Sequence, residues 1–294
     1  MTIKTQLSLR HQKLIVMKKI FLFIISLFAV HGYVSAQSPS CCNRSATSTF
    51  ASLGNDEAFV NAHLAPLPFT YTPVDGKMLT IQSPDGKVAN AYYVKKNGGN
   101  KTLILFHEWW GLNDYIKQEA EKWATALGVN VIAPDLYEGS IGTTAEEATK
   151  LMQGLKDERV RAIISGCIDY CGPKSELQTI GWCMGGGWSL QAALMAGPNA
   201  KGCVMYYGFP EKDKDKLSKL KCDVLGIFAT KDQWINAEVI KQFETDMKAS
   251  NKKLTVYSYD ADHAFANPSN PKYDKEATEQ AHTKALEFLK GNFK

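Results

Sequence analysis

The stretch Thr179-Ile180-Gly181-Trp182-Cys183-Met184-Gly185-Gly186-Gly187 places a thiol where a predicted strand turns into a helix. Glycines stand two residues before and two residues after Cys183, which is the spacing of a nucleophile elbow with its strained backbone turn. Such a turn raises the sulfur above the sheet and leaves the Met184 N–H at a helix N-terminus, where negative charge is stabilised. A structural cysteine in a glycine-rich packing turn is the alternative interpretation.

Strands and helices alternate along residues 75–294. A hairpin is predicted at 77–83 and 88–95, because Pro84-Asp85-Gly86 is a turn signal between two strand patterns. Further strands are predicted at 102–106, 129–133, 178–182, 201–207, 223–229 and 254–259. Helices are predicted from Asn113 to Gly128 and at 143–155, 159–169, 185–196, 211–217, 236–249 and 272–289. This alternation predicts an α/β fold with a mostly parallel central sheet and helices on both faces.

Two further ionisable groups follow predicted strands. Asp232 comes after the strand at 223–229, and His263 comes after the strand at 254–259. The chain order Cys183, Asp232, His263 is nucleophile, acid and histidine, which is the order of the α/β-hydrolase fold. Histidine can move a proton in both directions near neutral pH, and an acid fixes its tautomer. Asp260 and Asp262 are alternative acids, but Asp232 is preferred because an orienting acid normally comes from a separate loop.

A fourth element, His107-Glu108-Trp109-Trp110-Gly111, follows the strand at 102–106. Together with Gly-x-Cys-x-Gly-Gly and Asp-His-x-Phe, it resembles the dienelactone hydrolase (carboxymethylenebutenolidase) family over residues 75–294. The resemblance implies a catalytic triad of Cys183, Asp232 and His263, and a Glu108 that hydrogen-bonds the resting thiol and helps to form the thiolate. It also implies an oxyanion hole made by the N–H groups of Met184 and Trp109.

Several neighbours of these motifs have other expected roles. We assign His107 to structure, and we expect Trp109, Trp110 and Trp234 either to line the pocket or to belong to the core. Well-known members of the resembled family bind a substrate carboxylate with arginines, one of them four residues after the histidine. That position holds Asn267 here, and the predicted helix at 143–155 has no arginine. The sequence therefore favours a neutral ester or lactone as the small-molecule substrate.

The N-terminus has the pattern of a secretory signal peptide. Met17-Lys18-Lys19 precedes an apolar run from Ile20 to Val30, and Val34-Ser35-Ala36 forms a cleavage site. The run is shorter than the roughly 20 residues that a transmembrane helix needs, so we expect export, to the periplasm or outside the cell, without stable membrane insertion. Residues 1–36 are thus the predicted signal peptide, with 1–16 preceding a second candidate start. Residues 37–74 are predicted to be an extension or linker, and 75–294 to be the hydrolase domain.

The charge balance gives no support for nucleic-acid binding. The chain has 34 Lys and Arg against 30 Asp and Glu, and five of the basic residues but no acidic residue lie in 1–36. The mature chain therefore has 29 basic against 30 acidic residues, a net charge of about −1. The sequence carries no signal for an oligomeric state or for a cofactor.

All seven cysteines follow the predicted signal peptide, so at least one thiol is unpaired unless an intermolecular disulfide forms. We expect Cys183 to be that thiol, and the pairing of the others is open: Cys41, Cys42, Cys167, Cys171, Cys203 and Cys222. No cysteine or histidine has zinc-ligand spacing near Cys167 and Cys171, so we expect no metal site there.

The leading hypothesis is an exported cysteine hydrolase that cleaves a carboxylic ester, lactone or thioester through a thioacyl intermediate. An acyl transferase or peptidase on the same scaffold is the alternative among enzymes. A non-catalytic binding protein with this fold would not need all four catalytic-type residues. A thiol redox protein using Cys167 and Cys171 would lack the usual C-x-x-C motif.

Overall fold

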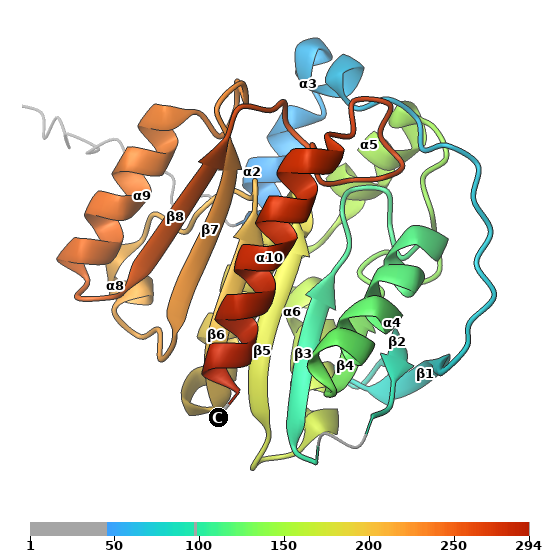
Figure 1. Ribbon diagram of the computed structural model, residues 1–294. Helices are drawn as coiled ribbons and strands as arrows, with labels where there is room; N and C mark the ends of the chain where they lie inside the picture. The colour runs from blue at the N-terminus through green and yellow to red at the C-terminus, as the bar shows by residue number, and fades with distance from the viewer. Residues whose placement is uncertain (1–45, 97–98, 294) are drawn as a thin grey trace, which may run out of the picture. The chain divides into compact units, whose positions relative to one another are not determined.

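The computed structural model of the chain describes residues 46–96 and 99–293. It shows an eight-stranded sheet with helices on both faces (Figure 1). The strand order is β1-β2-β4-β3-β5-β6-β7-β8. β1 pairs with β2, and β2 with β4, in antiparallel orientation, whereas the remaining neighbours in this sheet are parallel. The predicted mostly parallel α/β sheet is confirmed.

The element bounds agree closely with the sequence pattern. The strands are β1 (Gly76–Gln82), β2 (Val88–Val94), β3 (Lys101–Phe106), β4 (Asn130–Pro134), β5 (Glu176–Trp182), β6 (Ala200–Tyr206), β7 (Asp223–Ala229) and β8 (Leu254–Tyr259). The helices are α2 (Ala46–Leu53), α3 (Glu57–Ala62), α4 (Asp114–Leu127), α5 (Ala145–Gly154), α6 (Asp157–Cys171), α7 (Met184–Ala196), the short 3-10 turn Gly197–Asn199, α8 (Lys214–Leu217), α9 (Ala237–Ala249) and α10 (Lys275–Asn292).

Two layers of helices cover the sheet. α4 and α10 contact each other and lie over one face, toward the viewer in Figure 1. α7 packs against β3, β5 and β6, while α6 packs against β1, β2 and β4. Because both faces are covered, the central strands are almost wholly buried, and every residue of β4 is buried. This arrangement leaves the carboxyl edge of the parallel strands as the place where loops can build a site.

The predicted helix at 211–217 is shorter than expected, since α8 has only four residues, Lys214–Leu217. The buried Glu211 side chain accepts hydrogen bonds from Gln191 and from the N–H groups of Lys212 and Asp213. These bonds hold the backbone in a loop, and Asp213 then serves as the N-cap of α8.

The segment 37–74 also differs from the expected linker in the part that the structure describes. Residues 46–53 and 57–62 form α2 and α3, and Phe50 and Phe59 are buried in the core. We call residues 46–63 the N-terminal cap. α3 lies at the carboxyl edge of the strands, at the top of Figure 1, whereas α2 packs against α5 and α7.

The predicted signal peptide, Cys41 and Cys42 lie outside the described residues. Within residues 46–96 and 99–293, each helix is too short or too polar to cross a bilayer.

Candidate active site

Cys183 sits at a sharp turn between β5 and α7. Its φ of 55° lies in the left-handed region, which is strained for a residue with a side chain. A Cβ atom on Gly181 would collide with the Gly185 carbonyl oxygen, and one on Gly185 would collide with the His107 carbonyl oxygen. The two glycines are therefore required by close backbone contacts, as the elbow pattern predicts.

Three of the predicted site residues come together at the carboxyl edge of the sheet. The Nε2 atom of His263 lies 3.4 Å from the Sγ of Cys183. The other ring nitrogen, Nδ1, donates a hydrogen bond of 2.5 Å to Oδ2 of Asp232. In the neutral imidazole this arrangement leaves Nε2 as an acceptor that faces the thiol. The structure thus places the His263 imidazole between the Cys183 sulfur and the Asp232 carboxylate, in contact with both.

Asp232 is the acid that reaches His263, whereas Asp260 and Asp262 are exposed. The N–H groups of Trp234 and Ile235 donate to the second carboxylate oxygen of Asp232. Burial alone would raise the pKa of Asp232, but His263 and these two backbone donors lower it below its ordinary value. Asp232 is therefore a fixed negative charge beside the imidazole.

The environment sets the protonation of the Cys183 and His263 pair. Burial raises the pKa of the Cys183 thiol, and the nearby Glu108 carboxyl adds to this rise. Burial alone would lower the pKa of His263, but the Asp232 carboxylate outweighs it and raises that pKa. The resting sulfur is consequently a thiol, next to an imidazole that has been made more basic.

Glu108 is buried next to this group, but its carboxylate contacts other partners than the thiol. One oxygen accepts a hydrogen bond of 3.3 Å from the Tyr207 hydroxyl, and the other accepts one from the Asn267 amide. Among the described residues, no hydrogen bond joins Glu108 to Cys183, which differs from the expectation drawn from the family resemblance. Burial raises the pKa of Glu108 to about 7.

The two expected oxyanion donors belong to two different segments that follow strands β5 and β3. The Met184 N–H, at the start of α7, lowers the pKa of the Cys183 thiol, against the larger rise that burial causes. The Trp109 N–H belongs to the turn after β3, and no group in the described part of the chain accepts a hydrogen bond from it. The Trp109 side chain is fully buried.

The N-terminal cap adds a residue that the sequence analysis missed. The Nε2 atom of His63, at the C-terminal end of α3, lies 3.9 Å from the Sγ of Cys183. Its Nδ1 donates a hydrogen bond of 2.7 Å to the Phe59 carbonyl oxygen. Burial, with a contribution from His263, lowers the pKa of His63 to about 3, so its imidazole is neutral. The ligand atoms of His63, Cys183 and His263 lie within 4.8 Å of one another, as a metal site would need.

Aromatic rings seal the sulfur beneath this cap. Phe59 packs edge to face against Trp234 at a centroid distance of 5.1 Å, and the His63 ring lies 4.5 Å from the Trp109 ring. Asp56, the N-cap of α3, accepts a hydrogen bond of 2.9 Å from the Trp234 indole. Cys183 is only 1% exposed as a result.

A sequence signal for the cap does exist. Asp56 is followed by a short helix in which Phe59 and His63 stand four residues apart on one face, a weak pattern that is easily assigned to a linker. Tyr207, which contacts Glu108, has no such signal, because it is simply the residue after β6.

The remaining predicted neighbours have structural roles. His107 accepts a hydrogen bond from the Leu136 N–H, and its other ring nitrogen contacts the Glu108 carbonyl oxygen. Trp110 is buried against Trp109. Cys167, Cys171, Cys203 and Cys222 are free thiols, as is Cys183.

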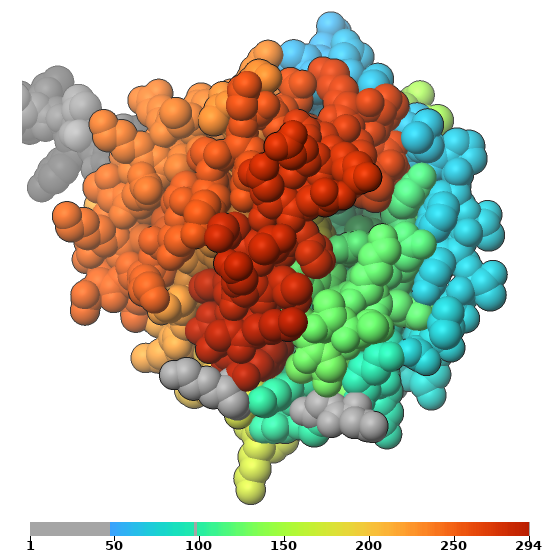
Figure 2. Space-filling view, viewed as in Figure 1, coloured from blue at the N-terminus to red at the C-terminus, as the bar shows by residue number. Residues whose placement is uncertain are grey.

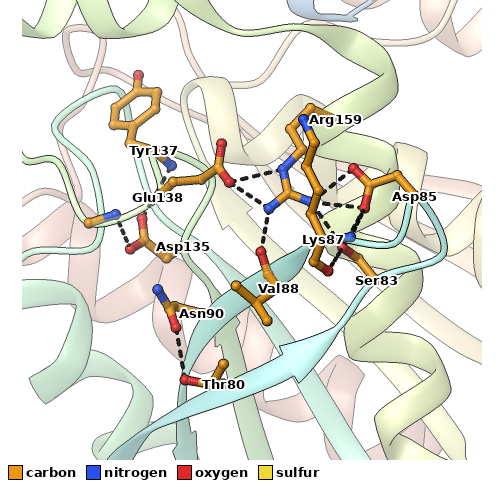
Figure 3. A network of polar contacts seen from close by, with 11 residues as sticks. Thr80, Ser83, Asp85, Lys87, Val88, Asn90, Asp135, Tyr137, Glu138 and Arg159 are labelled. Carbon is orange, nitrogen blue, oxygen red and sulfur yellow. Dashed lines mark hydrogen bonds and ion pairs between the residues drawn. The ribbon is translucent and has the colours of Figure 1, made fainter.

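The arginines of the described residues, Arg159 and Arg161, are engaged elsewhere. Figure 3 shows Arg159 held between Glu138 and Asp85, with N–O distances of 2.5 and 3.0 Å. Arg161 donates to Asp157 and Gln191, and no hydrogen bond joins it to the site residues above.

The sheet order, the elbow and the Cys183–His263–Asp232 arrangement define the class of the protein as an α/β-hydrolase. Comparison with known proteins then identifies the family. The profile of the dienelactone hydrolase family matches residues 89–293, more than half of the chain. The chain therefore belongs to the dienelactone hydrolase family and is an ester-bond hydrolase.

Similar proteins span most of the chain. Carboxymethylenebutenolidase of Pseudomonas sp. (strain P51) is 28% identical over 66% of this chain and 85% of its own length. Protein usf of Aquifex pyrophilus is 28% identical over 73% of this chain and 98% of its own length. A solved structure of a dienelactone hydrolase-like promiscuous phosphotriesterase from metagenomic libraries shares the fold, with a TM-score of 0.65 and 20% identity over 74% of this chain and 99% of that one.

Proposed function

We propose that this protein hydrolyses a neutral carboxylic ester, lactone or thioester with Cys183 as nucleophile, His263 as base and Asp232 as the orienting acid. The observation that carries the proposal is the contact of one imidazole with both partners, 3.4 Å from the thiol and 2.5 Å from the carboxylate. Such a chain of groups activates a nucleophile that is weak in its protonated form.

In the proposed first step, His263 Nε2 takes the thiol proton while Sγ forms a bond to the substrate carbonyl carbon. The carbonyl oxygen becomes negative, and the N–H groups of Met184 and Trp109 donate hydrogen bonds to it. The tetrahedral intermediate then collapses, the carbon–oxygen bond to the leaving group breaks, and His263 returns its proton to the departing oxygen. For an ester, the products of this half are a thioacyl-enzyme and a free alcohol; a lactone keeps its new hydroxyl on the acyl group, and a thioester releases a thiol.

In the second half, a water molecule replaces the alcohol. His263 takes a proton from the water, the hydroxyl oxygen bonds to the thioester carbon, and the carbon–sulfur bond breaks. The proton on His263 returns to the sulfur, which restores the Cys183 thiol and releases the carboxylic acid. Asp232 stays ionised throughout and stabilises the imidazolium that forms in each half.

Glu108 supports this cycle in our proposal by keeping the resting sulfur protonated. Its carboxyl raises the pKa of the Cys183 thiol, so the thiolate forms chiefly when His263 takes the proton. A thiol is less readily oxidised than a thiolate, which suits a nucleophile in an oxidising compartment. Tyr207 and Asn267 hold the Glu108 carboxyl in place for this purpose.

A neutral substrate follows from the charges around the site. A groove beside Glu108, hollowed between α4 and the loop after β8 in Figure 2, is lined by Glu119, Lys122 and Asn267 among others. Lys122 is already close to Glu119, at 3.7 Å. A substrate carboxylate would therefore meet acidic groups, and within residues 46–96 and 99–293 it would find no free arginine partner.

We also propose that the protein is exported, with cleavage after Ala36. The basic start, the short apolar run and the Val34-Ser35-Ala36 site support this location. Mass spectrometry of the mature N-terminus would test it, because a chain that retains residues 1–36 in the cell would contradict export.

The test of the proposed chemistry compares Cys183→Ala with Cys203→Ala, since Cys203 is an equally buried thiol away from the site. The first variant should lose hydrolysis of a small activated ester, while the second should retain most of it. Retained activity in Cys183→Ala would contradict the nucleophile. An acyl transferase would instead transfer the acyl group to an added amine or alcohol faster than to water.

A further inference from the structure

We propose that His63, Cys183 and His263 form a binding site for a zinc ion, with Sγ and the two Nε2 atoms as ligands. No local spacing in the sequence indicates this group, because His63 lies 120 residues before Cys183. Folding of the N-terminal cap brings the three buried side chains together, with their ligand atoms within 4.8 Å of one another. Thiolate and imidazole ligands together select zinc over magnesium or calcium.

The two sulfur-to-nitrogen distances are those of tetrahedral coordination. Zinc bonds to sulfur at about 2.3 Å and to nitrogen at about 2.0–2.1 Å, so tetrahedral geometry separates sulfur and nitrogen ligands by roughly 3.6 Å. The two observed sulfur-to-nitrogen distances, 3.4 Å to His263 and 3.9 Å to His63, lie on either side of this value. Three protein ligands leave the fourth position for a water molecule.

Both imidazoles are oriented as metal ligands. His263 donates its Nδ1–H to Asp232, and His63 donates its Nδ1–H to the Phe59 carbonyl oxygen. In its neutral form each ring therefore presents the lone pair of Nε2 to the same sulfur, and a carboxylate or carbonyl behind the ring is the usual support of a zinc-bound histidine. The proton of the Cys183 thiol can form a hydrogen bond with only one of the two Nε2 atoms at a time, whereas a metal cation would bind both.

The charges also balance. Zinc binding would release the Cys183 proton to solvent, so the thiolate and the Asp232 carboxylate would together neutralise the two positive charges of the ion. A buried ion is stable only when it is compensated in this way. The aromatic rings of Phe59, Trp109 and Trp234 hold the cap over the site and limit access of water to it.

Zinc in this site would reversibly inhibit hydrolysis and would hold the cap closed, because the metal would occupy the sulfur and the nitrogen that the reaction uses. The inhibition rests on the proposed function, whereas the binding does not. The two are therefore measured separately.

Binding is tested by titrating the metal-free full-length protein with Co²⁺, a spectroscopic substitute for zinc, and then displacing it with Zn²⁺. The expected result is a thiolate-to-cobalt charge-transfer band at one equivalent in the wild type, absent in Cys183→Ala. Loss of a second-shell partner weakens metal binding by about 10–100-fold, so His63→Gln should weaken it at least about hundredfold. His282→Gln is the matched control, because His282, in α10, stacks on Trp123 of α4 and is not one of the three proposed ligands.

His63→Cys keeps a zinc ligand at the same position and should retain much of the affinity, with a second thiolate-to-cobalt contribution. Comparison of His63→Cys with His63→Gln therefore separates the loss of a metal ligand from the loss of the fold. Circular dichroism of each variant checks that it is folded. Equal affinity in the wild type and in folded His63→Gln would overturn the proposal, as would a charge-transfer band that persists in Cys183→Ala.

The inhibition is tested by adding zinc to the wild type during ester hydrolysis and then removing it with a chelator. One equivalent should stop hydrolysis, and the chelator should restore it. If the cobalt band assigns the metal to Cys183 and His63 but hydrolysis continues unchanged, the metal site stands and the cysteine nucleophile is contradicted.

Discussion

The side-chain amide of Asn267 donates a hydrogen bond to the Glu108 carboxylate. This bond joins the loop that carries His263 to the turn after β3, and it places a neutral donor where the resembled family has an arginine. The positive charge that would attract a substrate carboxylate is therefore missing at this point. Burial raises the pKa of Glu108, and the hydrogen bond from Asn267 acts against this rise without adding a positive charge.

The first prediction concerns substrate charge. The value of kcat/KM for a neutral ester should exceed that for its carboxylate-bearing analogue by at least about tenfold, or roughly 1.4 kcal/mol of transition-state binding. The physical reason is the unpaired carboxylate that the anionic analogue would bury near Glu119. The two substrates should be compared at low salt, where the screening of electrostatic interactions is weakest. A preference for the anionic analogue would mean that a cation reaches the site.

The second prediction concerns the stability of Glu108→Gln at different pH values. Burial raises the pKa of Glu108 from 4.5 to about 7, so the folded state holds its proton more tightly than the unfolded state. The wild type should lose up to about 3 kcal/mol of stability from this group as pH rises from 4.5 through 7. Glutamine cannot ionise, so the variant should gain stability relative to the wild type over this window.

Urea unfolding at pH 4.5 and pH 8 measures this difference. Glu146→Gln, an exposed position in α5, is the control for the general effect of removing a carboxylate. A stability difference between Glu108→Gln and the wild type that does not change with pH would show that Glu108 ionises freely in the folded protein.

The third prediction tests the choice of acid. Asp232→Asn should lower kcat by orders of magnitude, because asparagine can donate to Nδ1 and so favour the wrong imidazole tautomer. Asp262→Asn is the matched control, since it lies one residue before His263 but is exposed. The values of kcat for both variants, measured by steady-state kinetics, test which aspartate is the acid. A larger loss in Asp262→Asn would move the acid to that residue.

The fourth prediction concerns the N-terminal cap. Asp56→Ala removes the N-cap of α3 and its bond to the Trp234 indole, so the cap should open more often. Iodoacetamide should therefore modify Cys183 faster than in the wild type, by several fold, as followed by mass spectrometry of the peptide that contains it. Cys203 on β6 is the internal control. An unchanged rate at Cys183 would show that the cap does not limit access.

Much of the fold could be predicted from local signals. The alternation of buried strands and helices gave the sheet, and the paired glycines around Cys183 predicted a turn that the backbone contacts explain. The chain order of Cys183, Asp232 and His263 placed their side chains at one edge, because parallel strands end there together. These features depend on short stretches of sequence, each with its own physical requirement.

What was missed depends on contacts between distant parts of the chain. His63 follows a six-residue helix without a sustained period, and its position beside Cys183 exists only after the cap has packed on the domain. The hydrogen-bond partners of Glu108 could not be predicted from the sequence either, since Tyr207 and Asn267 reach it from two other loops. The helix predicted from Glu211 begins only at Lys214, because the buried Glu211 carboxylate accepts hydrogen bonds from the next two backbone N–H groups.

The central claim is that the Cys183 sulfur forms a covalent bond with the acyl group. The most direct measurement is mass spectrometry of the protein quenched in acid during turnover of a slowly hydrolysed ester. The account predicts a wild-type mass increase equal to one acyl group, located on the peptide with Cys183, and none in Cys183→Ala. An acyl group located on another residue, or turnover that continues in Cys183→Ala, would contradict it.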